Sequence, residues 1–183
     1  MSWTTYRKSR LASYKKALDE GKVDAPAIKL LDRLNSNPDL VTLSSCSGRI
    51  DLLVYDIDKG KKESSHYAKW HNPVEHEDFE IKLNAYSGKL PLWFKCEPFI
   101  LHVAAKDVGV ADSFVKRMRA NGVRRGGIQA IGKSRVAIEV SGSTYISFPV
   151  EPMEGEWNEM LDMANRMMKK NRELLGRLEK VDW

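Results

Sequence analysis

The chain has few cysteines and no long apolar run. Its 183 residues include only Cys46 and Cys96, and the amino-terminal residues lack the apolar segment of a secretory signal. Two thiols without a secretory context are usually reduced, which favours a cytoplasmic protein. The longest apolar runs are also too short to cross a membrane, so we expect no membrane association.

Motifs of several common enzyme and metal-protein classes are missing as well. The sequence has no phosphate-binding P-loop, and no GxGxxG motif follows a strand, so the usual dinucleotide-binding fold has no support. It has no CxxC pair, and its histidines match neither a helical HExxH motif nor a zinc site. We therefore predict no bound metal ion. The histidines are His66, His71, His76 and His102.

Basic residues are concentrated in one part of the chain. Between residues 106 and 135, eight basic residues stand against two acidic ones, a net charge of +6 in a protein whose total is +5. A localised basic surface suits a polyanion, because neutralised phosphates release counterions. A solvated helix face followed by a loop would give the same composition, so the pattern alone leaves both interpretations open.

Hydrophobic spacing predicts alternating groups of helices and strands. Helices are expected over residues 3–18, 24–34, 75–86, 112–120 and 157–181, and Asp24 is expected to cap the second of them. Strands are expected over residues 40–44, 50–57, 93–106, 126–131, 135–141 and 144–150. Pro98 predicts an edge or a bend within the third of these strands.

This order of elements favours an α+β fold over a parallel doubly wound sheet. We expect residues 1–183 to form a single domain, in which helices flank a largely antiparallel sheet and the last helix is long. A helix–strand–strand unit occurs in each half, so an internal duplication is conceivable, although no sequence repeat supports it.

The most unusual local sequence is a run of small residues that ends in an arginine. We expect it to connect two apolar strands as a loop, whose hydroxyls and backbone amides can hydrogen-bond a charged group. The arginine can hold a carboxylate or a phosphate through two hydrogen bonds. Serine and glycine are common in plain turns, but a turn rarely needs so many of them before an arginine. The residues are Ser44, Ser45, Cys46, Ser47, Gly48 and Arg49.

A second group of polar residues lies in the strand expected over residues 93–106. Lys95 and Glu97 share one face of that strand, and such a pair beside a cleft can tune a proton acceptor. His102, five residues after Glu97, faces the opposite side of the strand unless the region of Pro98 bends or bulges. An ordinary ion pair at a strand edge explains the same residues equally well.

Together these residues resemble the wybutosine-synthesizing protein 3 family. The run from Ser44 to Ile50 resembles the family's signature, and the segment from Phe94 to Val103 matches a second one. The resemblance covers residues 20–178, which is nearly the whole chain. Other matching segments follow in the right order: Val23-Asp24, Leu31 to Asn35, Ser65-His66, Gly122-Val123-Arg124, Gly127-Ile128, Asn165 and Asn171.

The resemblance implies a tRNA methyltransferase of wybutosine biosynthesis. Members of this family methylate a ring nitrogen of the tricyclic, wyosine-type guanosine next to the anticodon of tRNA-Phe. Their methyl donor is S-adenosyl-L-methionine, and their partner is the anticodon loop. They resemble no standard methyltransferase fold, in agreement with the missing glycine-rich motif.

The resemblance also implies roles for the polar residues. We expect the methyl donor or a phosphate to bind to the segment made of Ser44, Ser45, Cys46, Ser47, Gly48 and Arg49. The candidates for positioning the base or accepting its proton are His66, Glu97 and His102. The expected contacts to tRNA phosphates are Lys95, Arg124 and Arg125. Trp70 or Trp93 is expected to stack on a flipped-out base.

Two other functions fit the sequence. A non-catalytic RNA-binding α+β module would use the basic stretch alone and would not bind S-adenosyl-L-methionine. A small-molecule enzyme built around Cys46 would need an activating base, and the sequence identifies none. The oligomeric state and the particular wyosine derivative stay open.

Overall fold

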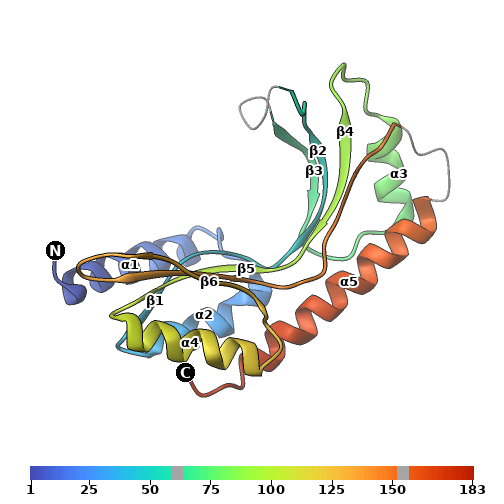
Figure 1. Ribbon diagram of the computed structural model, residues 1–183. Helices are drawn as coiled ribbons and strands as arrows, with labels where there is room; N and C mark the ends of the chain where they lie inside the picture. The colour runs from blue at the N-terminus through green and yellow to red at the C-terminus, as the bar shows by residue number, and fades with distance from the viewer. Residues whose placement is uncertain (59–63, 152–156) are drawn as a thin grey trace. The chain divides into compact units, whose positions relative to one another are not determined.

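The computed structural model of the protein describes residues 1–58, 64–151 and 157–183 (Figure 1). The chain forms two compact units, the first made of Met1–Ser47, Phe99–Ser143 and Arg172–Trp183, and the second of Gly48–Pro98 and Thr144–Asn171. The helices are α1 (Trp3–Asp19), the 3-10 helix η1 (Ala25–Ala27), α2 (Ile28–Ser36), α3 (His76–Asn84), α4 (Val108–Ala120) and α5 (Trp157–Leu178). The strands are β1 (Leu40–Cys46), β2 (Arg49–Val54), β3 (Ser65–Trp70), β4 (Leu92–Glu97), β5 (Ile100–Ala105), β6 (Arg125–Ile131), β7 (Val136–Ser141) and β8 (Ile146–Pro149).

The first unit contains a four-stranded antiparallel sheet in the order β1-β5-β7-β6. Helices α2 and α4 cover one face of it, because each presents an apolar stripe to the strands. Leu34 and Met118 from these helices are buried together with Val103 and Ile138 from the sheet. Helix α4 ends at residue 120, as the sequence predicts, and Gly122 just after it has a φ of 96° in the left-handed region.

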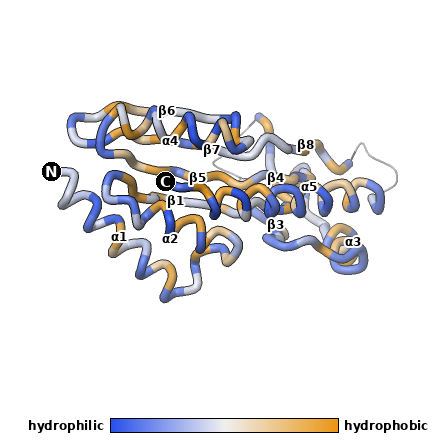
Figure 2. Tube along the Cα trace, turned by 90° about the horizontal axis from the view of Figure 1, so that it is seen from below, coloured by the Kyte–Doolittle hydropathy of each residue, from blue (hydrophilic) through white to orange (hydrophobic). Residues whose placement is uncertain are grey.

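The second unit contains a four-stranded antiparallel sheet in the order β3-β2-β4-β8. One face packs against α3 and the part of α5 that belongs to this unit, and the core there is aromatic. The ring centroid of Phe94 lies 5.6 Å from that of Phe79 and 6.1 Å from that of Trp157. Apolar residues recur at helical spacing among polar ones along α5 (Figure 2), so that they form one stripe of the helix, and this stripe faces the core. The other face of the sheet carries polar side chains.

The predicted α+β fold, with antiparallel pairing and a long C-terminal helix, is confirmed, and the strands form two sheets where the sequence predicted one. The single domain and the internal duplication stay predictions. Among the described residues, no helix is both long and apolar enough to cross a membrane.

One prediction about strands is wrong, and one strand was missed. The single strand expected over residues 93–106 is instead β4 followed by β5, which belong to different sheets. Pro98 lies between them. Proline has no amide hydrogen to donate to a sheet, so the ladder is interrupted there. The expected bend is therefore the point where the chain passes from one sheet to the other. Strand β3 is absent from the sequence prediction, because its residues are exposed or half-buried and show no apolar alternation.

Gly126→Ala is expected to destabilise the first unit by at least about 2 kcal/mol. Gly126 has a φ of 96°, a conformation that favours glycine, and an added Cβ would lie 2.1 Å from the backbone oxygen of Glu139. Denaturant unfolding measures the loss. Gly127→Ala is the matched control, because a Cβ at Gly127 meets no atom within 4 Å. An equal loss in both variants would contradict this explanation.

Candidate functional site

Side-chain alternation gives the second unit's sheet a polar face. On β2, Ile50 and Leu52 are buried in the core, so Arg49, Asp51 and Leu53 lie on the opposite face. Strand β4 alternates in the same way, with its odd-numbered residues on the polar face. The antiparallel register then places three pairs side by side, which are Arg49 with Glu97, Asp51 with Lys95, and Leu53 with Trp93.

A cavity of about 530 Å³ lies over this polar face. Both aromatic rings and charged groups line it, a combination that suits a small molecule or a nucleobase. Several residues with different predicted roles therefore meet at one place. The lining includes Arg49, His66, Trp93, Lys95, Glu97 and Tyr145.

Glu97 is the centre of an ion-pair network in this cavity. Lys95 Nζ lies 2.6 Å from Glu97 Oε1, and Arg49 Nη2 lies 2.6 Å from Glu97 Oε2. Burial alone would raise the pKa of Glu97, but the hydrogen bond from Lys95 and the charges of both cations lower it below its ordinary value of 4.5. Glu97 is therefore ionised at neutral pH, and a cation holds each of its carboxylate oxygens. The predicted shared face of Lys95 and Glu97 is confirmed.

Asp51 and His66 form a second charged pair. The Asp51 side chain is fully buried, and its Oδ2 lies 2.6 Å from His66 Nδ1 and 3.5 Å from Arg49 Nε. Burial raises the pKa of Asp51, although His66 and Arg49 act in the opposite direction. Sequence reasoning missed Asp51, whose only signal is a lone carboxylate within the apolar run from Ile50 to Val54.

His102 does not line this cavity. It lies on β5 in the first unit, where its Nδ1 is 3.0 Å from Ser44 Oγ and its Nε2 is 2.9 Å from Glu139 Oε2. The change of sheet at Pro98 separates it from β4. Of the three predicted proton acceptors, the structure therefore brings together His66 and Glu97 and places His102 in another sheet.

The loop predicted over residues 44–49 is much shorter than expected. Residues 44–46 continue β1, which pairs with β5 as far as Cys46 and Ile100, and Arg49 already belongs to β2. Pairing with a regular neighbouring strand outweighs the low strand preference of such small polar residues. The true connection is residues 47–48, and Gly48 has the left-handed φ of 95° that a tight connection requires.

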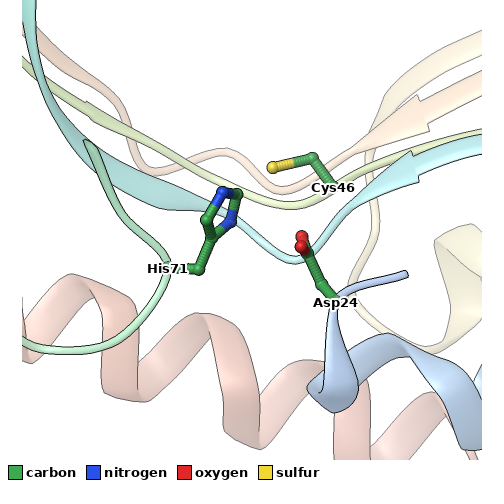
Figure 3. A group of neighbouring side chains, drawn as sticks. All are labelled: Asp24, Cys46 and His71. Carbon is green, nitrogen blue, oxygen red and sulfur yellow. The ribbon is translucent and has the colours of Figure 1, made fainter. Parts of the chain in front are cut away.

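The helix-capping hydrogen bond predicted for Asp24 is wrong. Asp24 precedes η1, but its side chain makes no capping hydrogen bond there. Its Oδ2 instead accepts a 2.7 Å hydrogen bond from the backbone amide of Ser47. The Cys46 thiol lies within 4.8 Å of the same carboxylate (Figure 3). Ser47 is buried and Ser44 is exposed, so the two ends of the serine segment differ in their access to solvent.

The residues predicted to contact RNA lie in both units. Arg124 and Arg125 are exposed next to or within β6 of the first unit. Lys95 belongs to the second unit, and only 17% of its side chain is exposed because it is paired with Glu97. Of the two predicted stacking residues, Trp93 lines the cavity, whereas Trp70 packs against Phe79 in the core, with 5.9 Å between ring centroids.

Comparison with known proteins gives matches over almost the whole chain. The family model described as methyltransferase TYW3 matches residues 5–181. A relative from Archaeoglobus fulgidus is 35% identical over 189 residues, which cover 99% of this chain and 93% of the relative. One from Thermococcus sibiricus is 30% identical over 179 residues, which cover 94% of this chain and 90% of the relative.

Both relatives are named tRNA(Phe) 7-((3-amino-3-carboxypropyl)-4-demethylwyosine(37)-N(4))-methyltransferase. A solved structure of a protein from Pyrococcus horikoshii is similar to this chain with a TM-score of 0.90 and 29% identity. That match covers 97% of this chain and 94% of the other. The likeness in sequence and the likeness in fold therefore each extend over almost the whole chain.

Proposed function

The chain belongs to the methyltransferase TYW3 family, and from this premise we propose that it methylates N4 of a wyosine-type guanosine next to the anticodon of tRNA-Phe. The methyl donor that we propose is S-adenosyl-L-methionine. The acceptor is the one named for the relatives. The observation that carries the proposal is the cavity of the second unit, which combines aromatic rings with charges of both signs.

The residues of this cavity fit both reactants. A wyosine-type base is a flat tricycle, and Tyr55, Trp93 and Tyr145 supply aromatic rings in the cavity lining. The donor and the acceptor named for the relatives each carry an amino-acid group, which has a carboxylate and an ammonium. Arg49 and Lys95 suit the carboxylate, and Glu97 suits the ammonium.

The donor, when bound, supplies a methyl group on a positively charged sulfur. The protein's part is then to align the acceptor nitrogen with that methyl group. Trp93 orients the base by stacking, Arg49 and Lys95 hold a carboxylate, and His66 takes up the proton that the acceptor nitrogen loses. A buried carboxylate beside a histidine in a cavity is typical of catalytic sites, and this favours the enzyme over a pure RNA-binding module.

We keep residues 44–48 as proposed contacts to the donor. The hydrogen bonds of Ser44 Oγ with His102 and of the Ser47 amide with Asp24 leave fewer groups for a ligand in this segment than its sequence suggests. Arg49 is the residue of the predicted segment that lines the 530 Å³ cavity.

The proposed function is tested with labelled donor and tRNA-Phe that lacks only the last methyl groups. We expect the label on N4 of the tricyclic base. Calorimetric titration with S-adenosyl-L-methionine separates the rivals, because an RNA-binding module should not bind it. A protein that binds tRNA but neither binds the donor nor transfers label would overturn the proposal.

We also propose that residues 1–183 act as one domain in the cytoplasm. The family match over residues 5–181 supports the single domain. The low cysteine content, only Cys46 and Cys96, supports a reducing compartment.

Reversing the charge at both Arg124 and Arg125 to Glu is expected to weaken tRNA binding and to reduce its dependence on salt. Both side chains are exposed, and each lost phosphate contact lowers the slope of log K against log salt concentration by about 0.7–0.9. Filter binding at several salt concentrations measures the slope. The matched control reverses Lys169 and Lys170, an exposed adjacent pair on α5. Equal slopes for the two double variants would remove Arg124 and Arg125 from the RNA surface.

A further inference from the structure

Asp51 is an unusual residue in the sheet of the second unit. It occupies the middle of three strands, where the register places Lys69 of β3 on one side and Lys95 of β4 on the other. Its side chain is fully buried, and Oδ1 has no hydrogen-bond partner among the described residues. A buried carboxylate with one unsatisfied oxygen costs stability, so its presence requires an explanation.

The other carboxylate oxygen of Asp51 holds His66. Oδ2 lies 2.6 Å from His66 Nδ1. An ionised carboxylate can only accept hydrogen bonds, so the ring donates from Nδ1, and in the neutral imidazole Nε2 then carries a lone pair. His66 lines the cavity, and 42% of its side chain is exposed. The imidazole therefore has one edge fixed by a buried acid and the other edge open to a ligand.

We propose that Asp51 is the positioning residue of the methyl transfer, which holds His66 in the tautomer whose Nε2 accepts the proton of the acceptor nitrogen. This inference rests on the function proposed above and identifies which predicted proton acceptor works. His66 Nε2 gains the N–H proton as that nitrogen bonds to the methyl carbon, and the former C–S electron pair stays on sulfur. The resulting imidazolium donates to Asp51 through a charge-assisted hydrogen bond and later releases the proton to water.

The other two predicted acceptors are already engaged by charged or hydrogen-bonding partners. Both carboxylate oxygens of Glu97 lie 2.6 Å from a cation, Lys95 on one side and Arg49 on the other. Both ring nitrogens of His102 are engaged, with Ser44 and Glu139. His66 is therefore the predicted acceptor with a ring nitrogen available to a substrate.

Asp51→Asn tests the proposal, because it keeps the shape of the side chain and changes its hydrogen bonding. The carboxamide nitrogen can donate to Nδ1, which favours the tautomer with its proton on Nε2. In serine hydrolases the same change lowers kcat about 10⁴-fold for this reason. Here we expect the single-turnover rate to fall by about 10²-fold and the KM for tRNA to stay within about threefold.

A spectroscopic measurement separates this role from a merely structural one. Nitrogen-15 NMR of labelled histidine reports which ring nitrogen carries the proton. We expect Nδ1–H for His66 in the wild-type protein and Nε2–H in Asp51→Asn. Asp162→Asn is the control, because Asp162 Oδ1 is 2.9 Å from Nε2 of the exposed His76, away from the cavity. This variant should keep both the rate and the His66 tautomer.

A second variant keeps the proposal falsifiable if Asp51→Asn does not fold. His66→Ala should lose about 10²-fold in rate and recover part of it with added imidazole. Full activity of either variant, or an Nε2–H tautomer in the wild-type protein, would overturn the proposal. A wild-type protein that transfers no methyl group to tRNA-Phe would overturn the proposed function and this role with it. An active wild type with a fully active Asp51→Asn would overturn this role alone.

Discussion

Arg49→Ala is expected to lower kcat/KM for tRNA methylation about 100-fold and to leave the chain folded. Arg49 lies between Glu97, which lines the cavity, and the buried Asp51, with Nη2 2.6 Å from Glu97 Oε2 and Nε 3.5 Å from Asp51 Oδ2. Without it, two negative groups lose the cation that they share, and a bound carboxylate loses its bidentate partner. Steady-state methylation of tRNA measures the effect, and circular dichroism checks the fold.

Two further variants test the reason for this effect. Arg49→Lys keeps the charge but not the planar fork that reaches both carboxylates, so it should recover only part of the activity. Lys16→Ala is the control. Lys16 lies on α1, and its Nζ is 3.8 Å from Oε1 of Glu20 just after the helix, in an exposed ion pair. A folded Arg49→Ala with wild-type kcat/KM would exclude Arg49 from the site.

The same variant has a consequence for acid stability. The pKa of Glu97 is lower in the folded protein than its ordinary value of 4.5, with Arg49 among the causes. Ionised Glu97 therefore stabilises the fold above pH 4.5, and this contribution is lost as the pH falls through the lower, folded pKa. Arg49→Ala removes part of it, so its midpoint of thermal unfolding should fall less than the wild type's on acidification through this range.

Side-chain alternation made part of the cavity predictable. Lys95 and Glu97 are two residues apart in a strand, so a shared face follows from the strand alone, and the structure places their charged atoms 2.6 Å apart. The same rule places His102 on the opposite face of a continuous strand from Lys95 and Glu97. The rule cannot predict that the chain changes sheet between β4 and β5, so that His102 lies in a different sheet from them.

Asp51 was not predictable, because its burial depends on neighbours that are distant in sequence. A single carboxylate in an apolar strand usually faces solvent, and only the pairing of β2 with β3 and β4 places Lys69 and Lys95 beside it. The pairing with His66 also depends on a register shift in β3 next to Tyr67. No local pattern in the sequence specifies such a shift.

The serine segment illustrates the limit of turn chemistry as a signal. Small polar residues predict a loop, but residues 44–46 pair with β5 and extend β1. The hydrogen bonds of the ladder outweigh local preference there. Gly48 is the residue for which the turn prediction is right, because its φ of 95° is accessible mainly to glycine.

Phe94→Ala is expected to destabilise the second unit by about 3–5 kcal/mol. Phe94 is fully buried, and its ring centroid lies 5.3–6.1 Å from those of Phe79, Phe148 and Trp157. Truncation leaves a cavity among large rigid rings. These rings cannot move far enough to fill it, so the cost in stability is high. Denaturant unfolding measures the loss. Ile81→Ala is the control within the same unit, because Ile81 on α3 is 57% exposed and should change stability by less than about 0.5 kcal/mol.

The same variant should lose activity before it unfolds. Phe94 lies between Trp93 and Lys95 on β4, and these neighbours point to the cavity while Phe94 points to the core. Its ring therefore fixes the strand that presents the stacking and charged groups. We expect methyl transfer to fall with rising temperature below the unfolding midpoint of Phe94→Ala. If activity instead persisted up to that midpoint, or if stability fell by less than about 1 kcal/mol, the aromatic core would not be what holds β4 in place.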